Sequence, residues 1–334
     1  MNIRERLEQD ELARLSPMAA KAAESRGRAV PEEESDVRTC FQRDTDRILH
    51  SKSFRRLMHK TQVFLRPEGD HYRTRMTHTL EVARIGRTIA RALRLNEDLT
   101  EAIAFGHDLG HTPFGHAGEV ALTEITGTPF LHNEQSLRVV DKLEKDGRGL
   151  NLTYEVRMGI VGHTGPRLPE TMEGQIIRFA DRIGYLNHDI DDAMRAGILQ
   201  ESDIPRSIAH VLGDCHRERI NTLVENMIYT TEQSGVVSMT KDILAAMDEL
   251  RDFMFQNVYR NPVAKGEEHK ARDILKGLYE YYSKHPEKLP ADFLPQLDFD
   301  GMDRTVCDYI AGMTDHYAIH VYSQLFIPAA WQIR

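Results

Sequence analysis

Helical periodicity runs through nearly the whole chain, and it restricts the fold more than any other feature of the sequence. Apolar residues recur every three or four positions, as Val82, Ile85 and Ile89 do, and no segment shows sustained alternation or an internal repeat. This spacing is typical of helices that each bury one face. We therefore predict an all-α fold, organised as a single helical domain over residues 1–334.

The periodic segments also place the individual helices. A short helix should begin the chain, and residues 26–35, with a glycine, a proline and a run of glutamates, should form a mobile loop after it. Residues 284–300 contain three prolines and should be an irregular connection. The other predicted helices cover 46–58, 77–93, 97–109, 132–143, 153–162, 175–196, 217–230, 240–255, 270–282, 304–312 and 316–326.

Composition and charge exclude several classes of protein. A formal net charge of −9 gives no general attraction to nucleic acid or to an anionic membrane. Cys40, Cys215 and Cys307 have neither zinc-site nor redox spacing, which suggests a reducing compartment. No apolar run is long enough to span a bilayer, and the first residues are charged rather than a signal sequence. We expect a cytoplasmic protein that does not bind membranes.

One segment, residues 107–119, concentrates groups suited to metal binding and proton transfer. Its sequence is HDLGHTPFGHAGE. The adjacent His107 and Asp108 offer a divalent metal one imidazole nitrogen and one carboxylate oxygen. His111, His116 and Glu119 are close enough in sequence to act on whatever that metal holds.

Helical geometry indicates how a second histidine could join this pair. On a helical projection, His78 and His107 lie on the buried faces of consecutive helices, near ends that can meet if the helices are antiparallel. The alternative is that each is a core histidine bonded to a backbone carbonyl.

The predicted helix 175–196 favours the metal site over that alternative. Asp181, Tyr185, His188 and Asp192 line up opposite its apolar face. A solvated face is the other explanation, but solvated faces are usually rich in lysine and glutamate, and this one is not. Asp181 would complete a ligand set of two histidines and two aspartates.

These residues resemble the metal-binding signature of the HD superfamily of phosphohydrolases. The surrounding sequence is similar to the deoxyguanosinetriphosphate triphosphohydrolase-like proteins, bacterial relatives of the sterile-alpha-motif HD dNTPase. Four motifs in order carry the similarity: RMTHTLEVA at 75–83, HDLGHTPFGHAGE at 107–119, HNEQS at 132–136 and ADRIGYLNHDIDDA at 180–193. Further matches, FRRL at 54–57, KTQV at 60–63 and DYIAGMTDHYA at 308–318, extend it over most of the chain.

The resemblance implies a fold, an activity and a metal. The fold would be an HD-domain helical core over 60–200 with helical extensions at both ends, the region 201–334 packing on the core. The activity would be hydrolysis of a deoxynucleoside triphosphate (dNTP), such as dGTP, to the deoxynucleoside and inorganic triphosphate. Mn²⁺, Mg²⁺, Fe²⁺, Co²⁺ or Ni²⁺ would be the cofactor, and its ligands would be His78, His107, Asp108 and Asp181.

The resemblance also implies catalytic residues. His116 would protonate the leaving sugar 5′-oxygen, and Glu119, three residues later, would orient His116 and raise its pKa if a helix begins after Gly115. His111 and His132 would stand beside the triphosphate. Each could instead be a supporting hydrogen-bonding residue.

Substrate contacts follow from the same motifs. Arg75 and Arg182 resemble the phosphate-binding cations, although a surface ion pair is the alternative for Arg182. Tyr185 would pack where a 2′-hydroxyl would lie, Asp189 would accept a hydrogen bond from the 3′-hydroxyl, and Gln62 would approach the base or sugar. Supporting roles are expected for His163, Asp192 and Tyr317.

A cationic region raises the question of further partners. It could guide a triphosphate into the site, bind an activating allosteric dNTP between subunits, or hold single-stranded DNA (ssDNA). Aromatic residues are sparse there, which favours nucleotide binding. Relatives suggest a homo-oligomer, a dimer or a hexamer. The members of the region are Arg43, Arg55, Arg56, Lys60, Arg66, Arg73 and Arg75.

Two other functions remain open. Another HD phosphohydrolase, such as a nucleoside monophosphatase or a cyclic-nucleotide or alarmone hydrolase, would share the four metal ligands but not the PFGHAGE continuation at 113–119. A nucleotide- or ssDNA-binding regulator with a vestigial site would have no reason to keep every ligand.

Overall fold

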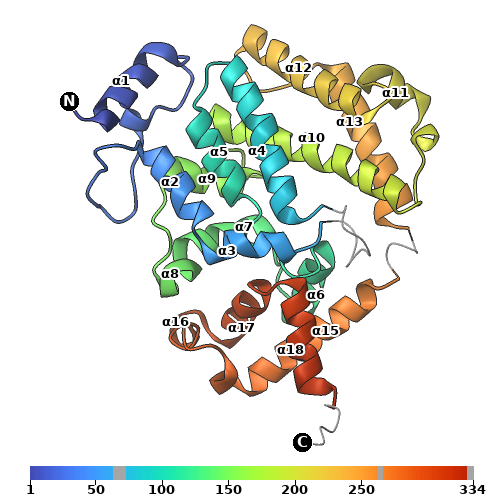
Figure 1. Ribbon diagram of the computed structural model, residues 1–334. Coiled ribbons are helices and arrows are strands. Elements are labelled where there is room, and N and C mark those ends of the chain that lie inside the picture. The colour runs from blue at the N-terminus through green and yellow to red at the C-terminus, as the bar shows by residue number, and fades with distance from the viewer. Residues whose placement is uncertain (63–72, 262–265, 329–334) are drawn as a thin grey trace, which may run out of the picture.

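The computed structural model describes residues 1–62, 73–261 and 266–328 (Figure 1). These residues form helices joined by loops and contain no β-sheet; their extended pairing is limited to isolated bridges between Arg28 and Thr153 and between Thr61 and Thr74. The all-α prediction is confirmed. None of the helices described is both long and apolar enough to cross a membrane.

The helices vary from single turns to one of 24 residues, and most match the predicted segments. The α-helices are α1 Ile3–Arg14, α2 Cys40–Leu49, α3 Lys52–Arg56, α4 Arg75–Ala92, α5 Glu97–Gly106, α6 His116–Thr126, α7 His132–Arg138, α8 Glu144–Gly147, α9 Tyr154–Gly162, α10 Met172–Arg195, α11 Arg206–Leu212, α12 His216–Ser234, α13 Lys241–Met254, α15 Glu268–Lys284, α16 Gln296–Asp300, α17 Met302–Ala311 and α18 Asp315–Phe326. Wider π-type turns extend α7 through η3 Val139–Leu143 and α13 through η5 Phe255–Tyr259, and short 3₁₀ turns form η1 Ala22–Glu24, η2 Leu57–His59, η4 Glu201–Asp203 and η6 Pro286–Lys288.

Side-chain caps fix the beginnings of the two helices that lead to the site. The hydroxyl of Thr74 accepts a hydrogen bond from the backbone of Thr77, and the Thr77 hydroxyl accepts one from the backbone of Thr74, so α4 begins at Arg75. Asn96 accepts from the Leu99 amide at 3.1 Å and starts α5.

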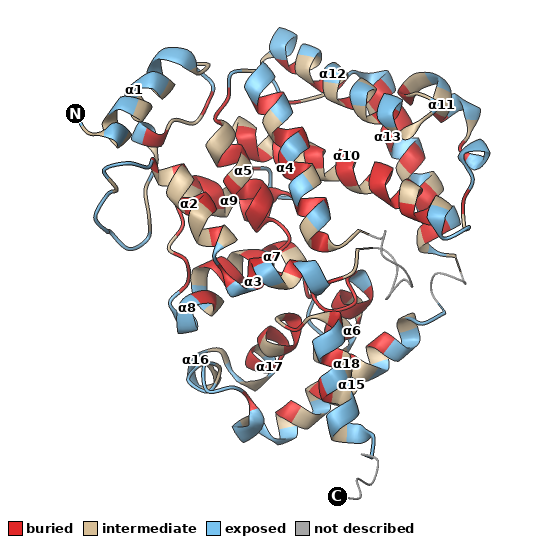
Figure 2. Cartoon of the chain, viewed as in Figure 1, coloured by how far each residue is buried: buried red, intermediate tan, exposed pale blue. Residues whose placement is uncertain are grey.

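The buried side chains form two separate hydrophobic cores. The first core joins α2, α4, α5, α9 and α10 with α11, α12 and α13. The second core joins α6 with α15, α17 and α18, which lie together at the lower end of the molecule in Figures 1 and 2. The region 201–334 is therefore divided between the cores: α11–α13 join the first, and α15–α18 form most of the second. The domain boundaries given above stay predictions.

Several local predictions were wrong. The predicted helix 46–58 is two helices, because Ser51 accepts from the Phe54 amide and caps a new start at Lys52. The irregular segment 284–300 contains η6 and α16. The helix α11, which has seven residues, was not predicted.

The loop at 26–35, predicted to be mobile, is anchored to the rest of the protein through Arg28. The guanidinium of Arg28 is buried, pairs with the carboxylate of Asp44 and donates to the carbonyl of Asn151 at 2.6 Å. Asp44 also accepts from the amide and hydroxyl of Thr153 at 2.8 and 2.7 Å. One buried ion pair therefore joins this loop to α2 and to the start of α9.

Candidate active site

The four predicted metal ligands converge from three elements of the first core. His78 lies in the first turn of α4, His107 and Asp108 directly follow α5, and Asp181 lies in the middle of α10. Nε2 of His78 is 3.1 Å from Oδ1 of Asp181, and Nε2 of His107 is 3.3 Å from Oδ1 of Asp108. The ligand atoms of His78, His107 and Asp108 lie within 4.8 Å of one another.

The contacts of His107 suit the binding of a cation. Its Nδ1 donates to the carbonyl of Ala104 at 2.6 Å, which leaves Nε2 for a second partner. That nitrogen is buried, has no hydrogen-bond partner among the described residues, and faces Asp108 and also Asp181 at 3.8 Å. One imidazole nitrogen with two carboxylate oxygens is a donor set that first-row divalent metals accept. The residues therefore fit a divalent metal.

Arg75 lies against the metal cluster and also faces the cavity beside it. Its Nη1 donates to Oδ2 of Asp108 at 3.1 Å, and its side chain is buried. Burial would raise the pKa of Asp108, but the neighbouring His107, His111 and Arg75 lower it well below its usual range. Asp108 is consequently a carboxylate at neutral pH.

Glu119 gathers three histidines around one carboxylate. Its Oε1 is 2.8 Å from Nδ1 of His132 and 3.2 Å from Nδ1 of His111, and its Oε2 is 3.3 Å from Nδ1 of His116. Burial would raise the pKa of Glu119, but hydrogen bonds from His116 and His132 lower it well below its usual range. His111 also reaches Oδ1 of Asp108 through Nε2, at 3.1 Å, and so links Glu119 to the metal cluster.

His163 contacts His132 on the side away from Glu119. Nδ1 of His163 donates to the carbonyl of Ile160 at 2.7 Å, and burial with the nearby His107 and His132 lowers the pKa of His163 to about 3. The neutral ring can only accept at Nε2, which is 3.1 Å from Nε2 of His132. The two nitrogens of His132 therefore face Glu119 and His163, which hold the ring in place from both sides.

A cavity of about 380 Å³ opens over these residues, a volume typical of a small-molecule site. Most of the sequence-predicted residues face it: Gln62, Arg75, His78, Asp108, His111, His116, His132, Asp181, Tyr185 and Asp189. Glu119 and His107 lie just behind this lining, as their contacts show.

Another part of the cavity wall comes from residues that were not predicted from the sequence. Phe255, Val258 and Tyr259 lie on the η5 turn that prolongs α13, and Phe114 lies before α6. The prediction ended this helix at 255. The spacing of Met247, Leu250, Met254 and Val258, at intervals of three and four, was a signal that the buried face continues. Thr164 and Glu268 complete this wall.

Asp189 meets Tyr259 at this wall. The Tyr259 hydroxyl donates to Oδ2 of Asp189 at 2.5 Å, whereas Oδ1 is buried and has no hydrogen-bond partner in the described parts of the chain. Burial raises the pKa of Asp189 to about 7, although the bond from Tyr259 lowers it. Burial likewise raises the pKa of Tyr185 to about 12, so its phenol stays neutral.

Some predicted residues lie elsewhere. Arg182 does not line the cavity and pairs instead with Asp248 on α13. Asp192 lies 3.1 Å from Nη1 of Arg73, outside the cavity lining, and Tyr317 is also absent from that lining.

Much of the cationic region is engaged within the protein. Lys60 donates to the carbonyls of His111 and Ala311, Arg56 donates to that of Gly312, and Arg43 pairs with Glu32. Arg73 bridges acidic residues of α4 and α10. Arg66 lies outside the described residues, as does most of the loop 66–73 that follows Gln62.

Comparisons with known proteins agree with this geometry. The HD domain family model matches residues 75–186, and the phosphohydrolase-associated domain model matches 237–324. The fold and its His/Asp cluster define a metal-dependent phosphohydrolase of the HD class.

Relatives over the full chain identify the family. They include proteins from Caldanaerobacter subterraneus subsp. tengcongensis, 55% identical over 99% of this chain and 98% of the relative, and Desulfatibacillum aliphaticivorans, 50% identical over 98% and 99%. A third, from Clostridium tetani, is 46% identical over 98% and 97%. Each is described as a deoxyguanosinetriphosphate triphosphohydrolase-like protein. The chain belongs to this family, and the resemblance inferred from its motifs is confirmed.

Proposed function

We propose that this protein hydrolyses a dNTP to the deoxynucleoside and inorganic triphosphate. Water would attack the α-phosphorus, the bond to the 5′-oxygen would break, and that oxygen would take up a proton. The names of the relatives, which refer to dGTP, support a nucleotide triphosphate as substrate.

The observation that carries the proposal is the carboxylate of Glu119 with three histidines, next to the four metal ligands. Any HD phosphohydrolase needs the ligands, but a proton donor for an alkoxide leaving group requires more. Glu119 holds Nδ1 of His116, so Nε2 is the nitrogen left to donate a proton into the cavity. His111 and His132 line the cavity and would stand beside the triphosphate.

The other residues would bind and orient the substrate. A divalent cation held by His78, His107, Asp108 and Asp181 would supply Lewis acidity toward a phosphate oxygen and toward water. Arg75 would contact a phosphate.

The sugar would lie between α10 and η5. Oδ1 of Asp189, which has no partner among the described residues, would accept a hydrogen bond from the 3′-hydroxyl. Tyr185 would occupy the space of a 2′-hydroxyl and so disfavour ribonucleotides. Gln62 would approach from the opposite edge of the cavity. Arg182 would act on phosphate only if it left Asp248, so its role depends on that pair opening.

The test is an assay of the purified protein with Mn²⁺ and all four dNTPs, singly and in pairs, with the products separated by anion exchange. Inorganic triphosphate and deoxynucleoside are expected from at least one dNTP. Stimulation of one dNTP by another would support the activating nucleotide, and light scattering would show the expected dimer or hexamer. Pyrophosphate or monophosphate as the primary product, across several metals, would favour another HD phosphohydrolase instead.

A further inference from the structure

The metal cluster and the proposed proton donor rest on different hydrophobic cores. The four metal ligands lie on or beside α4, α5 and α10, which belong to the first core. His116 and Glu119 lie on α6, whose Ala121 and Leu122 belong to the second core with α15, α17 and α18. The chain crosses between the cores within five residues, since Leu109 is in the first core and Phe114 in the second.

This crossing segment has an unfavourable backbone conformation. Phe114 has a φ of +62°, a left-handed conformation that costs a residue other than glycine roughly 1–2 kcal/mol. Gly115 follows with a φ of +57°, and a Cβ there would lie 2.9 Å from Nη2 of Arg75. The direction in which His116 leaves this turn therefore depends on what holds Phe114 in place.

Asp315 holds it. This aspartate begins α18, is 1% exposed, and does not line the cavity. Its Oδ1 accepts from the amide of Phe114 at 2.9 Å, and its Oδ2 accepts from the amide and the hydroxyl of Thr61 at 3.1 and 2.7 Å. One carboxylate thus fixes the turn before His116 and the strand-like segment that leads to Gln62.

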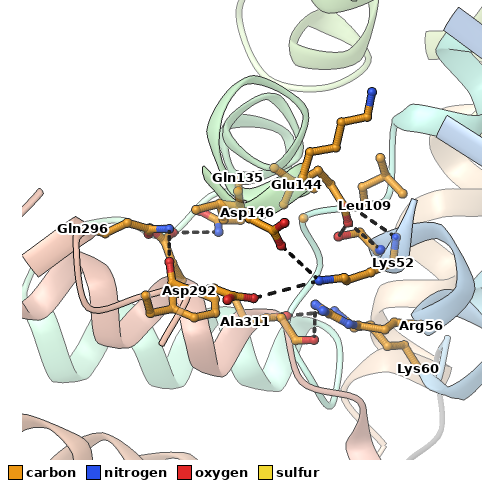
Figure 3. Close-up of a pocket in the computed structure, with 18 residues that line it drawn as sticks. Lys52, Arg56, Lys60, Leu109, Gln135, Glu144, Asp146, Asp292, Gln296 and Ala311 are labelled. Carbon is orange, nitrogen blue, oxygen red and sulfur yellow. Dashed lines mark hydrogen bonds and ion pairs between the residues drawn. The ribbon is translucent and has the colours of Figure 1, made fainter. Parts of the chain in front are cut away.

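Lys60 adds a second link between the same elements. Its ammonium group donates to the carbonyl of His111, in the crossing segment, and to that of Ala311 at the end of α17. Lys60 also lines a second cavity, together with Leu109 of the crossing segment (Figure 3). In that cavity the ammonium group of Lys52 pairs with the carboxylates of Asp146 and Asp292. The charge of Lys52 is therefore balanced within the protein. This region therefore joins the crossing segment to α17.

We propose that Asp315 is a positioning residue for the reaction: it holds the Phe114–Gly115 turn so that His116, on the second core, faces the metal cluster on the first. The inference rests on the proposed function, because it assigns His116 a proton-transfer role. Asp315 does not line the cavity, so it would not touch the substrate. Its loss should therefore reduce proton donation more than substrate or metal binding.

The experiment compares two leaving groups. A dNTP expels a 5′-alkoxide, which needs a proton, whereas the analogue with sulfur in place of the 5′-oxygen expels a thiolate, which does not. In Asp315→Asn, which retains the side-chain shape but replaces one acceptor oxygen with a donor, kcat for the dNTP should fall by about 10- to 100-fold. For the thio analogue, kcat should fall by less than about threefold. The affinity for Mn²⁺, measured by calorimetry, should also fall by less than about threefold.

Asp308→Asn is the matched control. Asp308 is equally buried and accepts from Gln135 at 2.9 Å and Arg138 at 2.7 Å, so it joins α17 to α7 without touching the crossing segment. This variant should lower stability without a selective loss on the dNTP. An equal loss on both substrates in Asp315→Asn, or the same selectivity in Asp308→Asn, would overturn the inference.

Two further variants keep the test decisive if Asp315→Asn does not fold. Thr61→Val removes one hydrogen bond to Asp315 and should show the same selectivity at smaller size, and Thr61→Ser should restore the dNTP rate. Equal rates in Thr61→Val and Thr61→Ser would count against the inference. Failure of the wild-type protein to release triphosphate would instead refute the proposed function.

Discussion

Oε1 of Glu119 and Nδ1 of His132 form a hydrogen bond of 2.8 Å between two different helices, α6 and α7. Burial would raise the pKa of Glu119, but this bond and the one from His116 lower it well below its usual range. The carboxylate is therefore ionised throughout the neutral range and can accept hydrogen bonds from the imidazoles around it. Its charge, rather than its shape alone, should matter for catalysis.

Glu119→Gln tests that statement. The amide retains the volume but loses the charge and one acceptor atom, so His116 and His132 can no longer both be held. We expect kcat to fall by roughly 10²-fold with little change in Mn²⁺ affinity. Glu124→Gln, an exposed position on the same helix, is the control and should retain wild-type kcat. Full activity in Glu119→Gln would contradict the proposed role.

His116→Ala should separate turnover from folding. The His116 side chain is 84% exposed, so its removal should leave the melting temperature nearly unchanged. Metal and substrate binding should persist while turnover falls by roughly 10²–10⁴-fold, the range of general acid catalysis. Steady-state kinetics with the preferred dNTP checks this. A variant with wild-type kcat would remove His116 from the mechanism.

Gly110→Ala should be costly because of close packing rather than backbone strain. A Cβ there would lie 2.1 Å from the amide nitrogen of Ser136, in the backbone of α7, so α7 and His132 would have to shift. We expect a loss of about 1–3 kcal/mol in the free energy of unfolding by urea, together with reduced activity.

Gly127→Ala is the control for that substitution. Gly127 ends α6 at a φ of +68°, and nothing lies within 4 Å of an added Cβ. Only the conformational cost of about 1–2 kcal/mol should remain, and activity should be unaffected. Equal losses of activity in the two variants would show that the packing of Gly110 against α7 has no special importance.

The sequence predicted those parts of the molecule that depend on local pattern. The helix ends that carry His78 and His107 followed from periodicity, and α6 begins at His116, after Gly115, as the predicted contact with Glu119 required. These features need only short-range spacing and residue type.

Features that depend on long-range packing could not be predicted in the same way. Arg182 could equally have faced phosphate, and only the position of α13 brings Asp248 to it. Tyr259 and Asp189 are 70 positions apart along the chain. The hydroxyl of Tyr259 reaches Asp189 because a π-type turn widens the end of α13. Asp315 appeared only as part of a family motif, since its contacts with Thr61 and Phe114 span more than 200 residues.

Metal removal should lower stability as well as activity. Binding to the folded state alone adds about 2.7 kcal/mol when the free metal is at 100 times its dissociation constant. Thermal melting with Mn²⁺, and again after chelation, should therefore show a higher midpoint with the metal. In His107→Gln the difference should largely disappear, because Nε2 of His107 is lost from the cluster. An unchanged difference in that variant would place the metal elsewhere.

Glu173, which lies outside the active site, should make the free energy of unfolding depend on pH. Its Oε1 accepts from the amides of Ala20 and Asn96, both at 3.0 Å, while Oε2 is buried with no partner in the described part of the chain. Burial raises the pKa of Glu173 to about 7 from the ordinary value of 4.5. The folded protein therefore binds this proton more tightly than the unfolded chain does. The resulting stability is fully present below pH 4.5 and is lost as the pH rises toward 7, by up to about 3 kcal/mol.

Glu173→Gln should remove this dependence, because the amide oxygen can replace Oε1 as the acceptor of both hydrogen bonds and the side chain no longer ionises. The measurement is urea unfolding of both proteins at several values between pH 5 and 8. Other titrating groups are common to the two proteins and cancel in the difference. Relative to the wild type, Glu173→Gln should gain stability as the pH rises, whereas a difference that stays constant with pH would show that Glu173 does not titrate in this range.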